Sequence, residues 1–559
     1  MEAGPTNTPP LRRRPWEVLL GVLMLTSAAL LLTVRSKLGF MLDDWAFVIS
    51  RAPGNLGDYL EPYNQHISIL PIAIYKLFLG IFGMTSAMPL HVVSVALFLL
   101  SVWVLFVYLR PLAGDPAAVI GCGLILFLGT AWEDLLWAFQ LGFSISIAAG
   151  IGALVMLRLE DRRHDRVACL LLVISILSNS LGIAFLAGVL VDLLLRRDGR
   201  IQRLWVVIVP SLIYAVWWAG WGRHEPTAIR AENALDAPLW IFNALRLAIA
   251  DTNGSFRLAG ETGDIVTGVV CVLVLTGLAL YLNRSRKVPR AFLVALAIGL
   301  AFWVLAALNS RDYAAVRYQL PGVVFLLMMV AGAVDGATIR PRVLGLIAVI
   351  ALVGISFNLV EMRDGYREFF RPLSDKGVAG LTALEISRAT VERDHEVGLN
   401  ADGSLAVTAG DYFDAEQRYG STAWDLDEVA RQTPDARAAV DRALVGTLPV
   451  SGVALPSGLA ASSCRMFAAG TPGSEPPIPL PARTFTFHPE NSVFLAVGRY
   501  GDGATTGATY GEAGVETLVR VPKDGSGEAW RIGFLGTGRV RVCDVVRERS
   551  FAGSVRVGG

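Results

Sequence analysis

Residues 88–109 read MPLHVVSVALFLLSVWVLFVYL, a run of 22 residues without a charged side chain. A helix rises about 1.5 Å per residue, so this run covers roughly 33 Å and can cross the hydrocarbon core of a bilayer. Similar runs recur, and the chain is therefore predicted to be a polytopic α-helical membrane protein. The apolar segments cover about residues 18–34, 88–109, 117–136, 140–158, 167–178, 183–195, 204–221, 264–282, 291–308, 319–335 and 343–360.

Composition divides the 559 residues into three predicted domains. Only 17% of the residues are charged, whereas soluble domains contain roughly 25%. The deficit lies in residues 1–360, the predicted membrane domain. Residues 361–480 mix helical and irregular patterns, with Pro434–Val445 as the clearest helix, and residues 481–559 alternate as in a β-sandwich. The net charge of +1 gives no indication of a nucleic-acid partner.

The basic residues predict the topology. With a cytoplasmic N-terminus, and with residues 67–82 lying in the membrane interface, the basic clusters fall on cytoplasmic connections, as the positive-inside rule requires. If residues 67–82 spanned the membrane, all of these clusters would move outside. We therefore predict eleven crossings, with a retained first helix rather than a cleaved signal peptide, and an outside C-terminal domain. The clusters are Arg110; Arg158, Arg162, Arg163 and Arg166; Arg196, Arg197, Arg200 and Arg203; Arg284, Arg286, Lys287 and Arg290; Arg340 and Arg342.

Two polar motifs lie in the first predicted outer loop. Asp43 and Asp44 follow the first helix, and adjacent carboxylates raise one another's pKa, which a cation or a substrate hydroxyl would relieve. A carboxylate here could act as a general base; the alternative is a helix cap or a pair of solvated acids. His66 begins the 67–82 segment and could orient a carboxylate or bind a metal, or it could simply be an interfacial polar residue.

Two later outer turns complete the candidate site. Glu133 and Asp134 form a second acidic pair at membrane depth, which could hold Mg²⁺ or Mn²⁺ together with the first pair, contact an acceptor, or only cap a helix. Arg311, Arg317 and Tyr318 lie in a turn before a late span. Arginine binds phosphate oxygens in a bidentate manner, so this turn is a candidate phosphate site; the alternative is interfacial snorkelling.

In the order of these motifs the chain resembles the GT-C glycosyltransferase superfamily. Within that superfamily the resemblance is to protein O-mannosyltransferases and aminoarabinose transferases. The resemblance rests on Asp43-Asp44, on the His-led segment 66–70 and on Arg317-Tyr318. It implies a polyprenyl-phosphate-linked sugar donor and a glycan, lipid or protein acceptor of the bacterial cell envelope, outside the plasma membrane. By this analogy Asp43 would be the general base, Asp44 would assist it, and Arg317 and Tyr318 would hold the lipid phosphate.

The chain departs from that family in three places. The first acidic pair is Asp-Asp where relatives usually have Asp-Glu, and the His-led segment lacks two tandem prolines. The turn at Glu133 and Asp134 is similar to the acidic motif of metal-dependent oligosaccharyltransferases, but without Asp-x-Asp spacing. Metal dependence therefore stays open. The β-rich tail is similar to the outer carbohydrate-binding domain of actinobacterial arabinosyltransferases, which makes glycan binding by residues 481–559 one interpretation.

Two other functions fit parts of the pattern. Segments 167–178 and 183–195 are short and broken by Ser178-Asn179-Ser180, and such broken helices are typical of transporters or flippases of polar or lipid-linked substrates. The acids, however, fall at helix ends, and no repeat relates the two halves. A sensor or assembly scaffold would need only an anchor, for which eleven spans are excessive.

The cysteines support an outside tail. Cys464 and Cys543 are the only two of the five cysteines outside the apolar segments. Disulfides persist in oxidising compartments, so an outside tail predicts a bond between these two residues, with two buried free thiols as the alternative.

Overall fold

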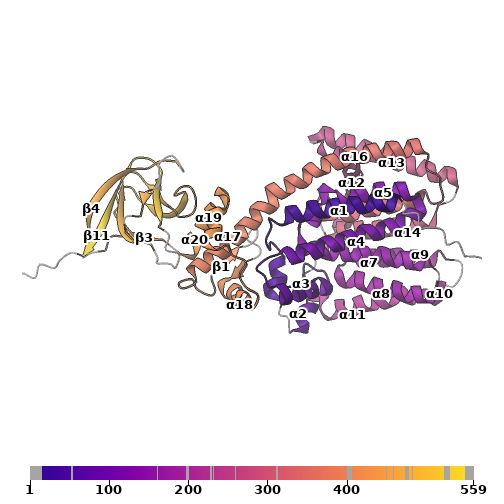
Figure 1. The fold of residues 1–559 in the computed structure, drawn as a ribbon, viewed down its shortest axis with the longest axis horizontal. Helices are drawn as coiled ribbons and strands as arrows, with labels where there is room; N and C mark the ends of the chain where they lie inside the picture. The colour runs from indigo at the N-terminus through magenta and orange to yellow at the C-terminus, as the bar shows by residue number, and fades with distance from the viewer. Residues whose placement is uncertain are drawn as a thin grey trace, which may run out of the picture. The chain divides into compact units, whose positions relative to one another are not determined.

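The computed structural model divides the chain into two compact units (Figure 1). The helical unit comprises Met1–Lys37, Ala46–Ile81 and Ala87–Phe370, and the C-terminal unit comprises Leu38–Trp45, Phe82–Ser86 and Arg371–Gly559. The residues that the structure describes are 15–51, 55–159, 161–196, 200–226, 229–230, 232–258, 260–286, 288–309, 312–398, 406–448, 450–456, 459–471, 478–480, 482–521 and 529–547.

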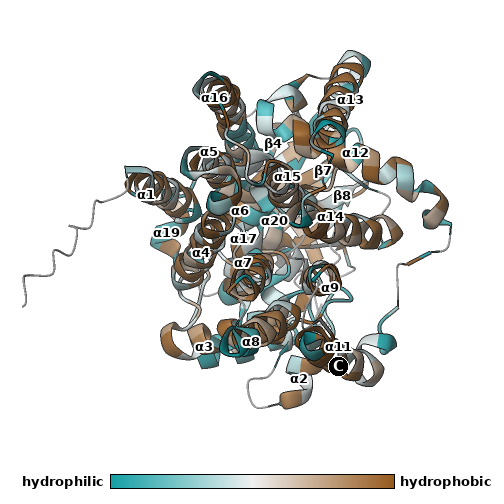
Figure 2. Cartoon of the chain, turned by 90° about the vertical axis from the view of Figure 1, so that its right-hand side faces the viewer, coloured by the Kyte–Doolittle hydropathy of each residue, from teal (hydrophilic) through white to brown (hydrophobic). Residues whose placement is uncertain are grey.

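The long helices of the helical unit are made mostly of apolar residues (Figure 2). The apolar runs of the sequence become the longer helices, and short 3-10 or π turns join several of them. The helices are α1 Pro15–Arg35, α2 Leu56–Leu60, α3 Ile69–Phe82, α4 Met88–Ala113, α5 Asp115–Leu126, α6 Trp132–Leu136, α7 Leu141–Leu157, α8 Arg162–Ser178, α9 Gly182–Leu194, α10 Arg200–Arg203, α11 Trp205–Gly220, α12 Asn233–Asn253, α13 Gly260–Ser285, α14 Arg290–Asn309, α15 Gln319–Ala333 and α16 Pro341–Asp364. The turns are η1 Ala46–Ser50, η2 Gly129–Ala131, η3 Ala138–Gln140, η4 Gly222–His224, η5 Ser255–Arg257, η6 Val316–Tyr318 and η7 Gly365–Phe370.

Seven helices of the described chain are long and apolar enough to cross a membrane, so the protein is a membrane protein. An eighth crossing is possible if Asp115–Leu126 and Gly129–Leu136, which are bent by 44° at their junction, form one broken span. Three of the eleven predicted crossings fall on α8, α9 and α11, which have only 17, 13 and 16 residues. These three crossings stay a prediction. The 14-residue α3 covers about 21 Å, which is too short for a perpendicular crossing.

A close approach between backbones fixes the break between α5 and α6. A Cβ atom on Gly129 would lie 1.6 Å from the carbonyl oxygen of Asn358, so a larger side chain could not occupy this position. The Thr130 amide donates to Asn358 Oδ1 over 3.0 Å, and Asn358 Nδ2 donates to the Asp251 carbonyl over 2.8 Å. Helix α16 thereby holds η2, and with it the acidic turn that follows, in a defined place.

The C-terminal unit packs helices against two antiparallel sheets around one core. One sheet has the strand order β5-β10-β7-β8 and the other β3-β9-β6-β11-β4. The Phe487 and Phe534 rings of the two sheets lie 5.5 Å apart, which makes the pair of sheets a sandwich. The helices are α17 Arg371–Ser387, α18 Ala409–Tyr419, α19 Leu426–Arg431 and α20 Pro434–Thr447. The strands are β1 Glu396–Gly398, β2 Ala406–Thr408, β3 Ser451–Ala454, β4 Leu459–Ala468, β5 Ile478–Pro479, β6 Thr484–Pro489, β7 Val493–Gly498, β8 Thr506–Gly511, β9 Thr517–Arg520, β10 Arg531–Leu535 and β11 Arg539–Arg547.

The sandwich begins earlier than residue 481, where the sequence places its start. Strands β3, β4 and β5 all precede that residue and pair with β9, β11 and β10, respectively. Their sequences contain little strict alternation of apolar and polar residues; β3 and β4 are largely exposed or half-buried. Long-range pairing with later strands, rather than local pattern, makes them strands.

A disulfide joins Cys464 and Cys543, the pair that the sequence analysis expects. Cys464 lies in β4 and Cys543 in the neighbouring β11, and the register of the two strands shifts beside Cys543, between Val542 and Asp544. The bond therefore links two adjacent strands of one sheet.

Asp441 joins α20 to the loop after β7. Its buried carboxylate accepts hydrogen bonds from the backbone amides of Arg499, Tyr500 and Gly501 over 3.0, 3.0 and 2.9 Å. Hydrogen bonds to a charged group contribute about 1.5–3 kcal/mol each, and a buried amide left without an acceptor costs more.

We therefore expect Asp441→Ala to lower the free energy of unfolding of the C-terminal unit by at least about 3 kcal/mol. Asp502→Ala is the matched control, because the Asp502 side chain is 71% exposed and only pairs with Arg437 at the surface. That control should cost under about 1 kcal/mol. Thermal unfolding followed by circular dichroism measures both variants, and equal melting temperatures would contradict the role of Asp441.

Candidate functional site

The candidate site is built around the acidic turn of α6. Asp134 is only 3% exposed, and neither of its carboxylate oxygens has a hydrogen-bond partner within the described residues. Its neighbour Glu133 is half-buried. A buried carboxylate without a donor is unfavourable, so its retention points to a ligand or a function that uses it. Of all the residues predicted for the site, Asp134 carries the clearest structural signal.

The turn is held from two sides within the helical unit. Arg35 at the end of α1 is buried, and its guanidinium donates from Nε to the Leu135 carbonyl over 2.8 Å. On the other side, the Trp132 ring packs against Phe369 and Phe370 of η7, each at 5.1 Å between ring centroids. A buried arginine bound to a backbone carbonyl fixes the local backbone and supplies positive charge beside the acids.

Aromatic rings pack beside the acidic turn. The rings of Trp137 and Phe139 stack at 5.0 Å, and Phe139 in turn contacts Phe47 at 4.8 Å and Tyr63 at 5.6 Å. The Trp137 indole nitrogen is buried and has no acceptor within the described residues. Aromatic rings and an unsatisfied N–H group beside a carboxylate are features of sugar and acceptor sites as well as of membrane interfaces.

His66 comes from a tight turn, Tyr63-Asn64-Gln65-His66. Asn64 and Gln65 have φ values of 50° and 65°, and the backbones of Tyr63 and His66 bond to each other in both directions at 3.0 and 2.9 Å. The Gln65 amide also donates to Glu225 Oε2 over 2.8 Å. Burial and, second, the positive charge of Arg317 lower the pKa of His66 to about 4. His66 is therefore neutral at physiological pH, and its buried Nδ1 has no partner within the described residues.

Arg317 and Tyr318 lie in η6, at the start of the span that includes α15. The Arg317 guanidinium lies 5.2 Å from the centre of the Tyr318 ring, and that ring packs against Trp240 at 5.9 Å and Phe302 at 6.0 Å. Arg317 is exposed, although its neighbouring tyrosine is anchored.

The positive charge of Arg317 influences three other predicted site residues of the helical unit. These residues are Glu133, Asp134 and His66, which come from distant parts of the sequence. The unit thus gathers two acids, a neutral histidine and an exposed cation at one place. Arg311, the other predicted phosphate ligand, lies outside the described residues.

Asp43 and Asp44 belong to the C-terminal unit, in its segment Leu38–Trp45. Leu42 has a φ of 49°, a left-handed backbone that is uncommon outside glycine and often marks a functional turn. Asp44 is 1% exposed and accepts a hydrogen bond from the Met41 amide over 3.0 Å, so it stabilises this turn. Asp43, which lies between Leu42 and Asp44, is half-buried.

A metal centre built from protein ligands is not found in the described part of the chain. No three His, Cys, Asp or Glu side chains come together there in a way that could hold a metal ion. The predicted set of Glu133, Asp134 and His66 therefore does not form a three-ligand cage within the described residues.

Sequence reasoning missed two buried groups near this turn. One is Arg35, which the sequence analysis does not single out. The other is Asp251 of α12, which is 2% exposed, interacts with the Thr130 side chain, and has an Oδ2 atom without a hydrogen-bond partner among the described residues. The residues before Asp251 are an apolar run, and an acid following such a run is the signal that could have identified it.

Comparison with known proteins adds no name to this site. No protein-family model matches the chain, and a search of curated proteins finds no significant match. The comparisons therefore assign no family, and the function is argued from the residues of the site.

Proposed function

We propose that the protein is a membrane glycosyltransferase that moves a sugar from a polyprenyl-phosphate donor to an acceptor outside the cytoplasm. The observation that carries the proposal is an exposed Arg317 whose charge reaches the buried Asp134, a carboxylate without a hydrogen-bond partner among the described residues, at the end of membrane helices. A lipid-linked sugar carries a phosphate for the cation and hydroxyl groups for the acid. The mixed charge of the site fits such a substrate better than a simple ion.

Arg317 and Tyr318 would hold the lipid phosphate. A guanidinium matches two phosphate oxygens, and the tyrosine hydroxyl can donate a further hydrogen bond. Packing of the Tyr318 ring against Trp240 and Phe302 holds that side chain in place before the substrate arrives. Positive charge there stabilises the leaving phosphate as the glycosidic bond breaks.

In the transfer step, an acceptor oxygen attacks the anomeric carbon while the bond from that carbon to the phosphate oxygen breaks. Polyprenyl phosphate leaves with the bonding electrons, and the acceptor proton passes to a carboxylate. We assign that role to Asp43, with Asp44 holding the turn through its bond to the Met41 amide. Glu133 and Asp134 would accept hydrogen bonds from sugar or acceptor hydroxyls.

The proposed orientation has the N-terminus in the cytoplasm and the acidic turn and the C-terminal unit outside. The basic clusters support it through the positive-inside rule, and the disulfide supports it because such bonds persist outside the reducing cytosol. The tail would then meet glycans directly, as a carbohydrate-binding domain would.

The test of the function uses the purified, full-length protein with a panel of polyprenyl-phosphate sugars. Release of polyprenyl phosphate, or appearance of a glycosylated product, with one donor and not with others would support the proposal. No turnover of any donor in the presence of envelope glycans, lipids and peptides would contradict it.

With an active donor in hand, Arg317→Gln should reduce kcat/KM by roughly 10²-fold, because one charge-assisted contact to the leaving phosphate is lost. Tyr318→Phe should cost only about tenfold, since the ring packing remains. Arg340→Gln is the matched control, because Arg340 is an exposed residue before α16 with no part in the site. Equal activity of the Arg317 and Arg340 variants would remove Arg317 from phosphate binding.

A transporter of a lipid-linked substrate is the second candidate. The specific observation in its favour is the 44° bend between Asp115–Leu126 and Gly129–Leu136, because it places the buried acid Asp134 in the second half of a broken helix. Movement of a fluorescent lipid-linked sugar across vesicles containing the protein, without cleavage of the donor, would favour the transporter over the enzyme.

A further inference from the structure

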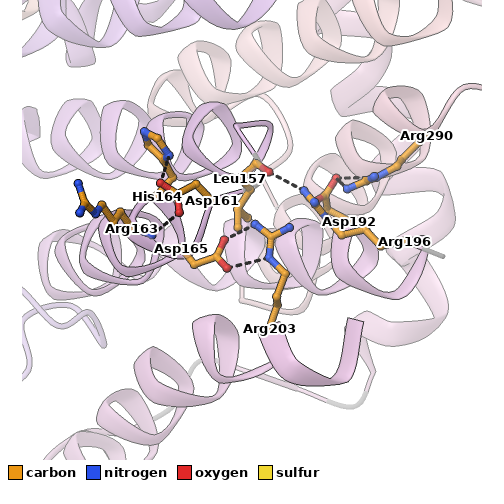
Figure 3. A network of polar contacts seen from close by, with 9 residues as sticks. All are labelled: Leu157, Asp161, Arg163, His164, Asp165, Asp192, Arg196, Arg203 and Arg290. Atoms are coloured by element: carbon orange, nitrogen blue, oxygen red, sulfur yellow. Dashed lines mark hydrogen bonds and ion pairs between the residues drawn. The ribbon is translucent and has the colours of Figure 1, made fainter. Parts of the chain in front are cut away.

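A second polar site lies at the other end of α7 from the acidic turn. Helix α7 starts directly after η3 and runs for 17 residues, or about 25 Å, to Leu157. There the ends of α7 and α9 meet the start of α14 in a network of ion pairs (Figure 3). This network takes no part in the function proposed above.

Asp192 is the centre of one part of the network. Its carboxylate binds Arg196 one turn later, with 3.1 Å between Asp192 Oδ2 and Arg196 Nη2, and it also binds Arg290, with 2.8 Å between Oδ1 and Nε. Arg196 also donates to the Leu157 carbonyl over 2.7 Å. Asp192 thereby ties α7, α9 and α14 together and fixes the direction of two guanidinium groups (Figure 3).

These arginines line a pocket of about 220 Å³, together with Arg158, Tyr108 and Asp335. The charged residues that line the pocket are therefore three arginines and two aspartates, which gives the lining a net charge of +1. A purely structural network would be expected to match each arginine with a carboxylate and to fill its centre with side chains. This one surrounds an open space.

Arg158 is the unmatched cation of the pocket. It forms no ion pair within the described residues; its guanidinium lies 4.2 Å from the centre of the Tyr108 ring, donates to the Tyr108 carbonyl over 3.0 Å and also interacts with the Tyr108 hydroxyl. An arginine has five N–H donors, so Arg158 keeps donors for a ligand. Arg290 uses its Nε and Nη2 groups on Asp192 and is also partly exposed.

We propose that this pocket binds a phosphate group, supplied by an anionic lipid headgroup or by a soluble phosphate compound. Two oriented guanidinium groups match phosphate oxygens, and a volume of about 220 Å³ admits a headgroup phosphate with its first substituents. Basic pockets between membrane helices commonly hold anionic lipid headgroups. In the orientation proposed above, this end of α7 faces the cytoplasmic leaflet, where such lipids gather.

The test measures lipid binding to the full chain in mild detergent by native mass spectrometry. Phosphatidylglycerol is the probe, phosphatidylcholine is the zwitterionic comparison, and inorganic phosphate is the soluble competitor. We expect Arg158→Gln to weaken phosphatidylglycerol binding by roughly tenfold, the value of one charge-assisted hydrogen bond. Asp335→Asn should tighten binding several-fold, because it removes a negative charge from the wall without removing a donor.

Arg340→Gln is again the matched control, since it removes an arginine that does not line the pocket. Arg158 lacks a carboxylate partner, so its variant should fold even if Arg290→Gln does not. Selective phosphatidylglycerol binding that millimolar phosphate does not displace assigns the site to a lipid; displacement by phosphate assigns it to a soluble compound. Equal lipid binding by the Arg158 and Arg340 variants, or unchanged binding by Asp335→Asn, would overturn the proposal.

Discussion

Replacing Asp43 by asparagine is expected to lower the rate of sugar transfer by about 10²- to 10⁴-fold while the protein still inserts and folds. The amide keeps the shape of the carboxyl group but cannot take the acceptor proton, and a general base contributes about this factor. Folding should survive because Asp44, not Asp43, holds the turn through the Met41 amide. The measurement is the initial rate of polyprenyl phosphate release at saturating donor.

Asp58→Asn is a suitable control in the same loop. Asp58 accepts a hydrogen bond from Asn55 Nδ2 over 2.6 Å at the start of α2, and it has no role in the proposed proton transfer, so its variant should keep near-full activity. Asp44→Asn separates positioning from chemistry: it should lower activity together with thermal stability. Near-full activity of Asp43→Asn would transfer the base role to Asp44, Glu133 or Asp134. Near-full activity of Asp43→Asn, Asp44→Asn, Glu133→Gln and Asp134→Asn alike would argue against carboxylate catalysis.

Helices whose formation depends on residues near in sequence could be predicted from local sequence patterns. Uncharged apolar runs became long helices such as α4 and α14, because a membrane requires the backbone of such a run to satisfy its own hydrogen bonds. Helix α20 begins at Pro434 as predicted, with Thr433 accepting from the Ala436 amide over 3.3 Å. The helix runs through Gly446 to Thr447 because its end is decided by packing in the core, not by the glycine.

Features that depend on distant contacts could not be predicted in the same way. The break after Leu126 depends on Asn358, more than two hundred residues later, and no local pattern announces that contact. The same holds for Asp441, whose role comes from the amides of a loop near residue 500. In the site, residue types suggested Asp134 and Arg317, but only the fold shows that Asp134 is buried and has no hydrogen-bond partner in the described part of the chain.

Reducing or removing the disulfide is expected to destabilise the C-terminal unit by on the order of 4 kcal/mol. The bond joins Cys464 and Cys543, which are 79 residues apart, and the chain-entropy model gives about this value for a loop of that length. The variant Cys464→Ser with Cys543→Ser should therefore unfold at a markedly lower temperature. Since Cys543 is 1% exposed, its serine also leaves a buried hydroxyl in need of a partner.

A double alanine variant separates these two effects, because alanine removes the bond without adding a polar group. If both double variants melt at the same lowered temperature, the lost cross-link accounts for the change. The wild-type protein in reducing buffer should then melt at the same temperature as the alanine variant. Cys122, Cys169 and Cys271 are buried free thiols of the helical unit and serve as internal references for labelling under denaturing conditions.

The same bond tests the orientation of the whole protein. Disulfides form and persist outside the cytosol, so the tail should be oxidised when the protein is taken directly from cells and blocked with a thiol reagent. Non-reducing mass spectrometry should then find Cys464 joined to Cys543 and three free thiols. Two blocked thiols at 464 and 543 would contradict both the bond and an outside tail. They would also move the proposed acceptor to the cytoplasmic side, because the tail follows the last predicted crossing directly.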